Sequence, residues 1–440
     1  MTPGQPCRRH SPNDLDFRFW LAFWAIAITN LAAALDATTL SVALPITASI
    51  GGGRTEAFWA GTSCLLACAA VLLFWASLSD AFGRRPMQLL TLAIFAAGSV
   101  VCVVAENYTV MIVGRTIQGL GGGGVLGLTT VLITDLVPLR DRDRFYALIS
   151  VIWALGSTTG PIIGGACAVS GQWRWIFCLA GVGFFLKLTR RPGSLSSKLR
   201  RLDYFDSGFF HGVYYVVIDS GHLGRNPVCL GQLADACAVA TCSTSIVYAG
   251  SFVHGLVLYT LVYYMPEYFQ AVKGYSALVS GVAALPQTVT VEPSAIFVGA
   301  VVGRTGRYRW AIWVGWVLTT LGLGLLILLG VNTSVPAWIF LSIVSGLVMG
   351  LLFPSIALAL QSSVPQVDVA MAATLVLFFR SFGQAVGVAI GSSILDNRLR
   401  IDLRDPAVAN VLPPDLADVG AVPLYRASRP YPRTRPWPWP

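Results

Sequence analysis

The sequence consists of long apolar stretches separated by short polar ones. A segment of about 20 mostly apolar residues can cross the hydrocarbon core of a bilayer as a helix. A transmembrane β-barrel would instead show segments of about ten residues with alternating hydrophobicity. The pattern therefore predicts an all-α, polytopic membrane protein with about eleven spans. We place them at residues 19–44, 57–78, 87–105, 108–134, 145–169, 173–188, 245–266, 277–302, 310–330, 335–361 and 369–395.

The distribution of basic residues between these stretches predicts their orientation. Short cytoplasmic loops are enriched in Lys and Arg. The basic residues gather before the first span and after the second, fourth and sixth spans, whereas the alternate loops of this half contain only Arg54 and Arg174. We therefore expect a multi-pass protein of the cell membrane with a cytoplasmic N-terminus.

Five parts follow from this reading of the chain. They are a cytoplasmic tail (1–18), a six-helix N-terminal half (19–188), a linker with degenerate apolar segments (189–244), a C-terminal half with five spans (245–396) and a polar, Pro/Arg-rich tail (397–440). In the linker, the apolar piece at 209–218 is too short to span, and we expect an interfacial helix there. The charged window after residue 396 cannot supply a sixth C-terminal span.

An internal repeat relates the two halves. A constant offset of 223 residues separates three pairs of glycines, which are Gly83 and Gly306, Gly160 and Gly383, and Gly164 and Gly387. The same offset brings the start of the first span close to the start of the seventh. Two related halves joined by a cytoplasmic loop are an architecture of transporters.

Composition narrows the class of protein. Hydrophobic residues make up 55% of the chain and charged residues only 12%, against about 25% charged residues in soluble domains. This excludes a soluble enzyme, a nucleic-acid-binding domain and a disordered regulator. The net charge of +9 is explained by basic loops, so the expected partner is the lipid bilayer and not nucleic acid. The nine scattered Cys residues predict small buried side chains, and we expect neither a metal nor a cofactor.

Ionisable residues inside the predicted spans are candidates for function, because burying them in a membrane is unfavourable. Asp36 lies in the first span and Arg115 in the fourth, and both are roughly 10–14 Å from the outer face at 1.5 Å per residue. They can meet in a central cavity, and Gln118 shares the face of Arg115. A purely structural ion pair is the alternative. Glu292 lies in the eighth span and is a weaker candidate for proton coupling.

The loop between the second and third spans contains Asp80, Gly83, Arg84 and Arg85. Gly83 permits a tight turn, and Asp80 can pair with an Arg or lie at a helix N-terminus. We interpret Asp80 and Gly83 as a conformational latch. For Arg85, a role in this latch and a role that only sets the membrane topology are equal alternatives.

The fifth span contains a series of small residues with one proline, which are Gly156, Gly160, Pro161, Gly164 and Gly165. Small residues every four positions allow close approach of another helix, and the proline removes a hydrogen bond and kinks the helix. We favour a hinge or gating seam over ordinary tight packing.

These motifs resemble those of a known family. Residues 79–86 resemble the signature between the second and third spans of the major facilitator superfamily, and Arg115 to Gly119 resembles its fourth-span motif. Residues 156–165 resemble its antiporter motif, and residues 35–45 resemble the first-span motif of fourteen-spanning fungal drug:proton antiporters. The similarity covers about residues 15–205 and 245–405.

The resemblance implies a two-half helical bundle that exports hydrophobic or amphipathic small molecules, such as drugs, toxins or secondary metabolites, against a flow of protons. We also expect a monomer. Two features depart from the pattern. Ala76 replaces a glycine of the signature, and the two linker-derived spans and the final span are missing or degenerate.

Three alternatives remain beside the antiporter. The first is a truncated, transporter-derived membrane protein with weak or no transport. The second is a membrane-embedded enzyme, which we do not expect because the four His residues, at positions 10, 211, 222 and 254, are not clustered. The third is a receptor or structural protein derived from a transporter.

Overall fold

The computed structural model describes residues 17–47, 54–137, 142–170, 172, 174–177, 242–305, 307–364 and 369–402. All regular secondary structure in these ranges is helical, and ten helices are long and apolar enough to cross a membrane. They are α1 (Phe17–Thr47), α2 (Arg54–Phe82), α3 (Arg84–Val103), α4 (Tyr108–Leu136), α5 (Arg142–Val169), α10 (Cys242–Ala271), α11 (Ala277–Thr305), α12 (Arg309–Leu325), α13 (Val335–Ser363) and α14 (Val369–Asp402). A 3₁₀ turn, Leu326–Leu328, extends α12.

The all-α, polytopic fold expected from the sequence is confirmed, and the ten helices coincide with ten of the eleven predicted spans. The remaining predicted span, 173–188, and the linker with its expected interfacial helix lie almost entirely outside the described residues. The helix α14 continues to Asp402, beyond residue 396, where the sequence placed the end of the C-terminal half. The boundaries of the five predicted parts remain predictions.

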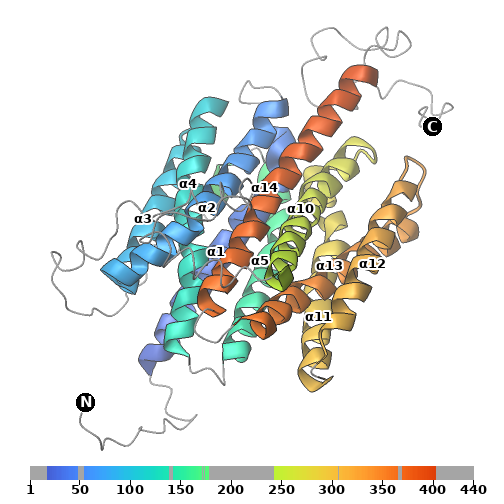
Figure 1. Cartoon of the computed structure of the whole chain (residues 1–440). Helices are drawn as coiled ribbons and strands as arrows, with labels where there is room; N and C mark the ends of the chain where they lie inside the picture. The colour runs from blue at the N-terminus through green and yellow to red at the C-terminus, as the bar shows by residue number, and fades with distance from the viewer. Residues whose placement is uncertain are drawn as a thin grey trace, which may run out of the picture.

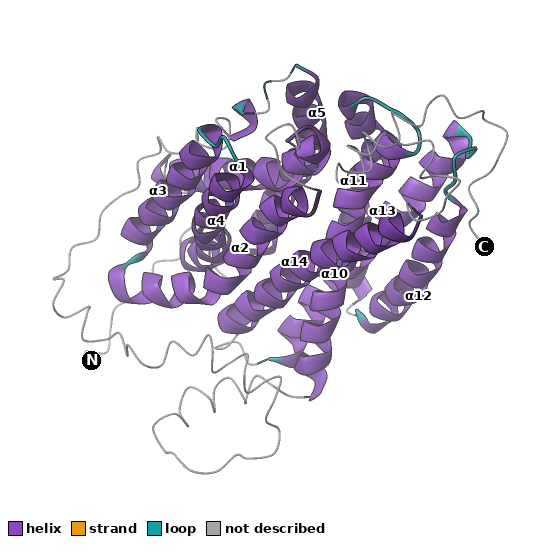
Figure 2. Cartoon of the chain, turned by 90° about the horizontal axis from the view of Figure 1, so that it is seen from above, coloured by secondary structure: helices purple, strands orange, loops and turns teal. Residues whose placement is uncertain are grey.

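The helices form two groups of five with the same internal packing (Figures 1 and 2). In the first group, α1 packs on α5, and α4 packs on both α2 and α3. In the second, α10 packs on α14, and α13 packs on both α11 and α12. Figure 2 shows α3 and α12 at opposite edges of the molecule. Helices in equivalent positions along the two halves therefore have equivalent neighbours.

The glycines related by the 223-residue offset make equivalent contacts. Gly160 of α5 lies against Thr38 of α1, and Gly383 of α14 lies against the carbonyl group of Phe252 in α10. A Cβ atom at either position would overlap these neighbours. The fifth helix of each half therefore packs on the first helix by backbone approach, as small residues permit in membranes.

The bundle has two ends, which we name after loop residues. The Gly83 end carries the α2–α3 turn, and the Asn107 end carries the α3–α4 turn, where the side chain of Asn107 accepts a hydrogen bond from the amide of Val110. Each half has a hydrophobic cluster of its own near the Gly83 end. These clusters include Phe23, Trp75, Leu128 and Phe145 in the first half, and Tyr248, Leu352 and Ile356 in the second.

One buried cluster joins the two halves, and it lies toward the Asn107 end. It combines Leu40 and Phe58 with Tyr263 of α10 and Val388 of α14. Phe58 also stacks on Tyr264 with ring centroids 5.3 Å apart. These contacts hold the halves together at this end.

Candidate functional site

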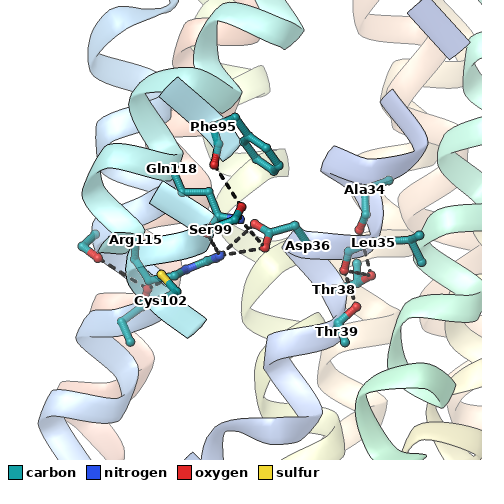
Figure 3. A network of polar contacts seen from close by, with 12 residues as sticks. Ala34, Leu35, Asp36, Thr38, Thr39, Phe95, Ser99, Cys102, Arg115 and Gln118 are labelled. Atoms are coloured by element: carbon teal, nitrogen blue, oxygen red, sulfur yellow. Dashed lines mark hydrogen bonds and ion pairs between the residues drawn. The ribbon is translucent and has the colours of Figure 1, made fainter. Parts of the chain in front are cut away.

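The candidate site is a buried ion pair between α1 and α4 (Figure 3). Nη1 of Arg115 lies 2.8 Å from each carboxylate oxygen of Asp36. The two side chains are nearly inaccessible, with relative exposures of 2% for Arg115 and 4% for Asp36. The structure thus brings together two residues that are 79 positions apart in the sequence. It places them in direct contact inside the first half.

Gln118 completes this pair. Its Oε1 accepts a hydrogen bond from Nη1 of Arg115 at 2.6 Å, and its Nε2 donates to Oδ1 of Asp36 at 2.8 Å and to Oγ of Ser99 at 3.0 Å. The side-chain amide therefore uses both N–H groups and its oxygen. Because a reversed amide would place an NH₂ group against the guanidinium, this network fixes the orientation of Gln118.

The remaining contacts of the Arg115 guanidinium come from neighbouring helices. Its Nε donates to the carbonyl oxygen of Ala60 in α2 at 3.3 Å, and its Cζ lies 5.6 Å from the ring centroid of Phe177. Two glycines allow this approach. A Cβ at Gly98 would collide with the backbone of Gln118, and one at Gly119 would collide with the carbonyl group of Cys64. The close contact of α4 with both α2 and α3 is therefore what buries the pair.

This arrangement couples the charge of Asp36 to the position of two helices. An isolated charge in a membrane interior is strongly unfavourable, and removing one partner of a buried pair leaves the other uncompensated. Protonation of Asp36 removes its negative charge and with it most of the attraction to Arg115. The pair is therefore suited to linking proton binding with a movement of α1 relative to α4.

The α2–α3 turn has the geometry that Gly83 requires. Gly83 has φ of 98° and ψ of 149°, a conformation that is essentially restricted to glycine. Its amide donates to the carbonyl oxygen of Ser79 at 3.0 Å, and Nη1 of Arg84 donates to Oγ of Ser79 at 2.7 Å. Nε of Arg85 is buried without a hydrogen-bond partner among the described residues. The side chain of Asp80 lies outside the described part of the structure.

The small residues of α5 face two different helices. Gly156, Gly160 and Gly164 lie against α1, where a Cβ would meet Ala34, Thr38 and Thr39 respectively. Gly165 and the carbonyl group of Pro161 instead lie against α11 of the other half. α5 is thus packed by backbone contacts on both sides, once within its own half and once across the boundary between the halves.

Glu292 is not part of the Asp36 network. It lies on α11, and the charged group with which it interacts is Arg380 of α14. Sequence reasoning missed Arg380, although the signal was available, since it is an arginine inside the apolar span Ala372–Arg398. Among the described residues, no three His, Cys, Asp or Glu side chains are grouped so that they could hold a metal ion.

A two-half bundle of membrane-spanning helices with an ion pair buried in its interior has the architecture of a secondary transporter. Residues 26–392 match the sequence profile of the Major Facilitator Superfamily, and the chain belongs to this family. It is accordingly a multi-pass membrane protein of a non-enzymatic transporter class whose members bind small molecules. The family suggested by the sequence motifs is therefore confirmed.

Individual members of this family are similar to the chain over most of its length. The MFS transporter L2 of a Phoma species is 41% identical over 425 residues, which cover 88% of this chain and 71% of that protein. The efflux pump FUS6 of Gibberella moniliformis is 33% identical over 423 residues, covering 87% of this chain and 75% of the pump.

A solved structure shows the same fold. It is a bacterial homologue of the human lysosomal transporter Spinster, in an inward-facing and unoccupied conformation. The TM-score is 0.69 at 15% identity, and the alignment covers 94% of this chain and 92% of that chain.

Proposed function

We propose that this protein is a proton-coupled antiporter that exports hydrophobic or amphipathic small molecules, such as drugs, toxins or fungal secondary metabolites. The observation that carries the proposal is the buried pair of Asp36 and Arg115, a titratable group held by a charged partner inside the membrane. The similarity to a protein named as an efflux pump supports the direction of transport. We further propose that it acts as a monomer in the cell membrane.

The basic residues of the bundle support a cytoplasmic location for one of its two ends. Arg84 and Arg85 lie at the Gly83 end, and Arg304, Arg307 and Arg309 lie in the equivalent α11–α12 turn of the second half. We assign the Gly83 end, and with it the N-terminus, to the cytoplasm on the basis of the positive-inside tendency. The cluster shared by the two halves then lies toward the outer surface, which supports an inward-facing conformation.

The proposed cycle uses the ion pair as its switch. With Asp36 ionised, its attraction to Arg115 and Gln118 holds α1 against α4 in the arrangement seen here. Protonation neutralises Asp36 and weakens this contact, so that the relative free energies of the two conformations change. A proton can drive transport only because the two conformations differ in affinity for it.

Replacement of Asp36 by Asn tests the proposal. Asn keeps the size of the side chain and one acceptor oxygen but does not titrate. Wild-type protein in proteoliposomes should move one or more of a set of cationic, neutral and anionic amphipathic dyes when a pH gradient is imposed, and the Asp36→Asn variant should lose this pH-driven transport. Glu106→Gln is the matched control, because Glu106 is exposed in the α3–α4 turn.

Two results would contradict the proposal. One is full pH-driven transport by Asp36→Asn. The other is a wild-type protein that stays folded but transports none of the dyes, as expected for a transporter-derived protein without activity. Monodispersity of both proteins in detergent serves as the check on folding.

A further inference from the structure

The second half contains an arginine inside an apolar span, and this arginine takes no part in the ion pair of the first half. Arg380 lies eight residues inside the α14 span Ala372–Arg398, or about 12 Å from its start at 1.5 Å per residue. Gly255 of α10 packs against its backbone, and the ring of Phe353 in α13 lies 4.3 Å from its Cζ. The guanidinium is therefore held within the interior of the C-terminal half.

Arg380 differs from Arg115 in its partners. Arg115 is matched by a carboxylate, an amide oxygen and a backbone carbonyl. Nε of Arg380 is buried with no hydrogen-bond partner, and its guanidinium forms no hydrogen bond or ion pair with any residue in the described ranges. A guanidinium has five N–H donors, and leaving them unmatched in a membrane interior is unfavourable.

Three titratable side chains lie within electrostatic range of this guanidinium. They are His254 and Tyr259 on α10 and Glu292 on α11, each of which interacts electrostatically with Arg380. The ring of His254 already bonds to the carbonyl oxygen of Met349 through Nε2, at 3.0 Å. Glu292 supplies the opposite charge but lies beyond ion-pair distance among the described contacts. The donor set of Arg380 therefore remains open to another acceptor.

We propose that Arg380 is the anion-binding residue of a substrate site in the C-terminal half, and that this site takes amphipathic organic carboxylates. A guanidinium matches a carboxylate by two parallel hydrogen bonds. The guanidinium lies over one face of the Phe353 ring, and the rest of that ring offers an apolar contact for the body of the same molecule. Small hydrated anions lack this second contact and would lose their hydration on entry.

Arg380 and its neighbour Glu292 are less deeply buried than the ion pair of the first half. Arg380 and Glu292 both retain partial exposure, whereas Arg115 and Asp36 are closed off. The negative charge of Glu292 opposes a bound carboxylate. Removing the charge of Glu292 should therefore strengthen carboxylate binding, whereas removing the charge of Arg380 should weaken it. The two variants thus have effects of opposite sign.

A substrate site presupposes the proposed transport function, so the inference rests on that function. The test, however, measures binding alone. Purified full-length protein in detergent is titrated with 1-naphthylacetate and 4-phenylbutyrate, and separately with their neutral primary amides, in the absence of any pH gradient. Binding is followed by calorimetry and by thermal stabilisation. Because no proton gradient is present, a failure of proton coupling leaves this result unchanged.

In the wild type, each carboxylate should bind about tenfold or more tightly than its amide, the difference expected for a charge-assisted hydrogen bond. Arg380→Gln should abolish this preference, and Glu292→Gln should increase it. Arg380→Lys keeps the charge but not the planar fork, and it should retain only part of the preference. Arg398→Gln, an exposed site on the same helix, is the matched control and should change nothing.

The proposal is overturned if neither carboxylate binds the wild type, or if Arg380→Gln keeps the preference for the charged form. Should Arg380→Gln not fold, the comparison of Arg380→Lys with Glu292→Gln decides. Equal affinities for the carboxylate in these two variants would then refute a role for Arg380.

Discussion

Gly165 of α5 lies directly against Ala277 of α11, across the boundary between the two halves. A Cβ atom at position 165 would lie 2.7 Å from the carbonyl oxygen of Ala277 and 2.7 Å from Cα of Leu278. One turn away, Gly281 of α11 packs in the same manner against the carbonyl group of Pro161. The halves thus approach each other by backbone contacts from both sides, and a larger side chain at this point must separate them.

Replacing Gly165 by Val should therefore open the Asn107 end of the bundle. The added side chain overlaps backbone atoms, which cannot rotate away as a side chain can. The measurement is the rate at which a maleimide modifies Cys167, read by mass spectrometry of its peptide, because Cys167 is partly buried beside the cluster that joins the halves. We expect a clearly faster reaction than in the wild type.

The control for this experiment is Gly324→Val. Gly324 lies on α12, where an added Cβ has no neighbour within 4 Å, so the same substitution should leave the reactivity of Cys167 unchanged. Equal rates for Gly165→Val and the wild type would show that the contact at Ala277 does not limit opening.

Removing one partner of the ion pair should destabilise the protein more than removing both partners. Arg115→Met keeps the length of the side chain but leaves Asp36 as an uncompensated buried charge. We expect a loss of about 3–5 kcal/mol, the usual effect of removing one partner of a buried pair. Adding Asp36→Asn to Arg115→Met should restore much of the stability, because the remaining charge is then removed.

The measurement for the pair is thermal unfolding of the two single variants and the double variant in one detergent. The comparison isolates the coupling between the two residues. If the double variant is as unstable as the sum of the two single variants, Asp36 and Arg115 act independently and the interpretation fails.

The sequence was sufficient for the class of fold because each span is a long apolar segment that needs no partner to be recognised. The sequence also predicted similar depths for Asp36 and Arg115, because the depth of a residue in a helix follows from its distance in residues to the end of the span. What it could not provide is the distance between them, which depends on the contacts of Gly98 and Gly119 with neighbouring helices. Backbone approach of this kind leaves no periodic signal in one sequence.

Charge inside the second half was harder to interpret. Glu292 was identified from its position in an apolar helix, but its relationship to Arg380 depends on how α11 and α14 are arranged around α10 and α13. The repeat does not help here. The offset of 223 residues pairs Asp36 with Tyr259 and Arg115 with Trp338, so the ion pair of the first half has no counterpart in the second. The two halves share their packing but not their polar groups.

Gly83 provides a test of backbone conformation. With φ of 98° and ψ of 149°, it occupies a region in which any Cβ is strained by about 1–3 kcal/mol. Gly83→Ala and Gly83→Asn should both lower the thermal stability, because the tolerance of Asn extends only to the left-handed helical region. Gly330→Ala is the control, since Gly330 lies in a turn without positive φ and with space for a Cβ. A stable Gly83→Asn variant would contradict this account of the turn.

The α2–α3 turn should control the rate of transport and not the binding of substrate. Arg84 donates to Ser79 across the turn, and the motif that contains it lies at the Gly83 end, whereas Arg380 lies about 12 Å inside the bundle. Arg84→Gln and Asp80→Asn should each slow pH-driven dye transport by about tenfold, which corresponds to a change of about 1.4 kcal/mol in the barrier. The affinity for 4-phenylbutyrate, measured by calorimetry, should stay at the wild-type value. Arg307→Gln, in the equivalent turn of the second half, is the control and should alter neither. Lost binding in Arg84→Gln or Asp80→Asn, at unchanged thermal stability, would mean that the turn contributes to the substrate site itself.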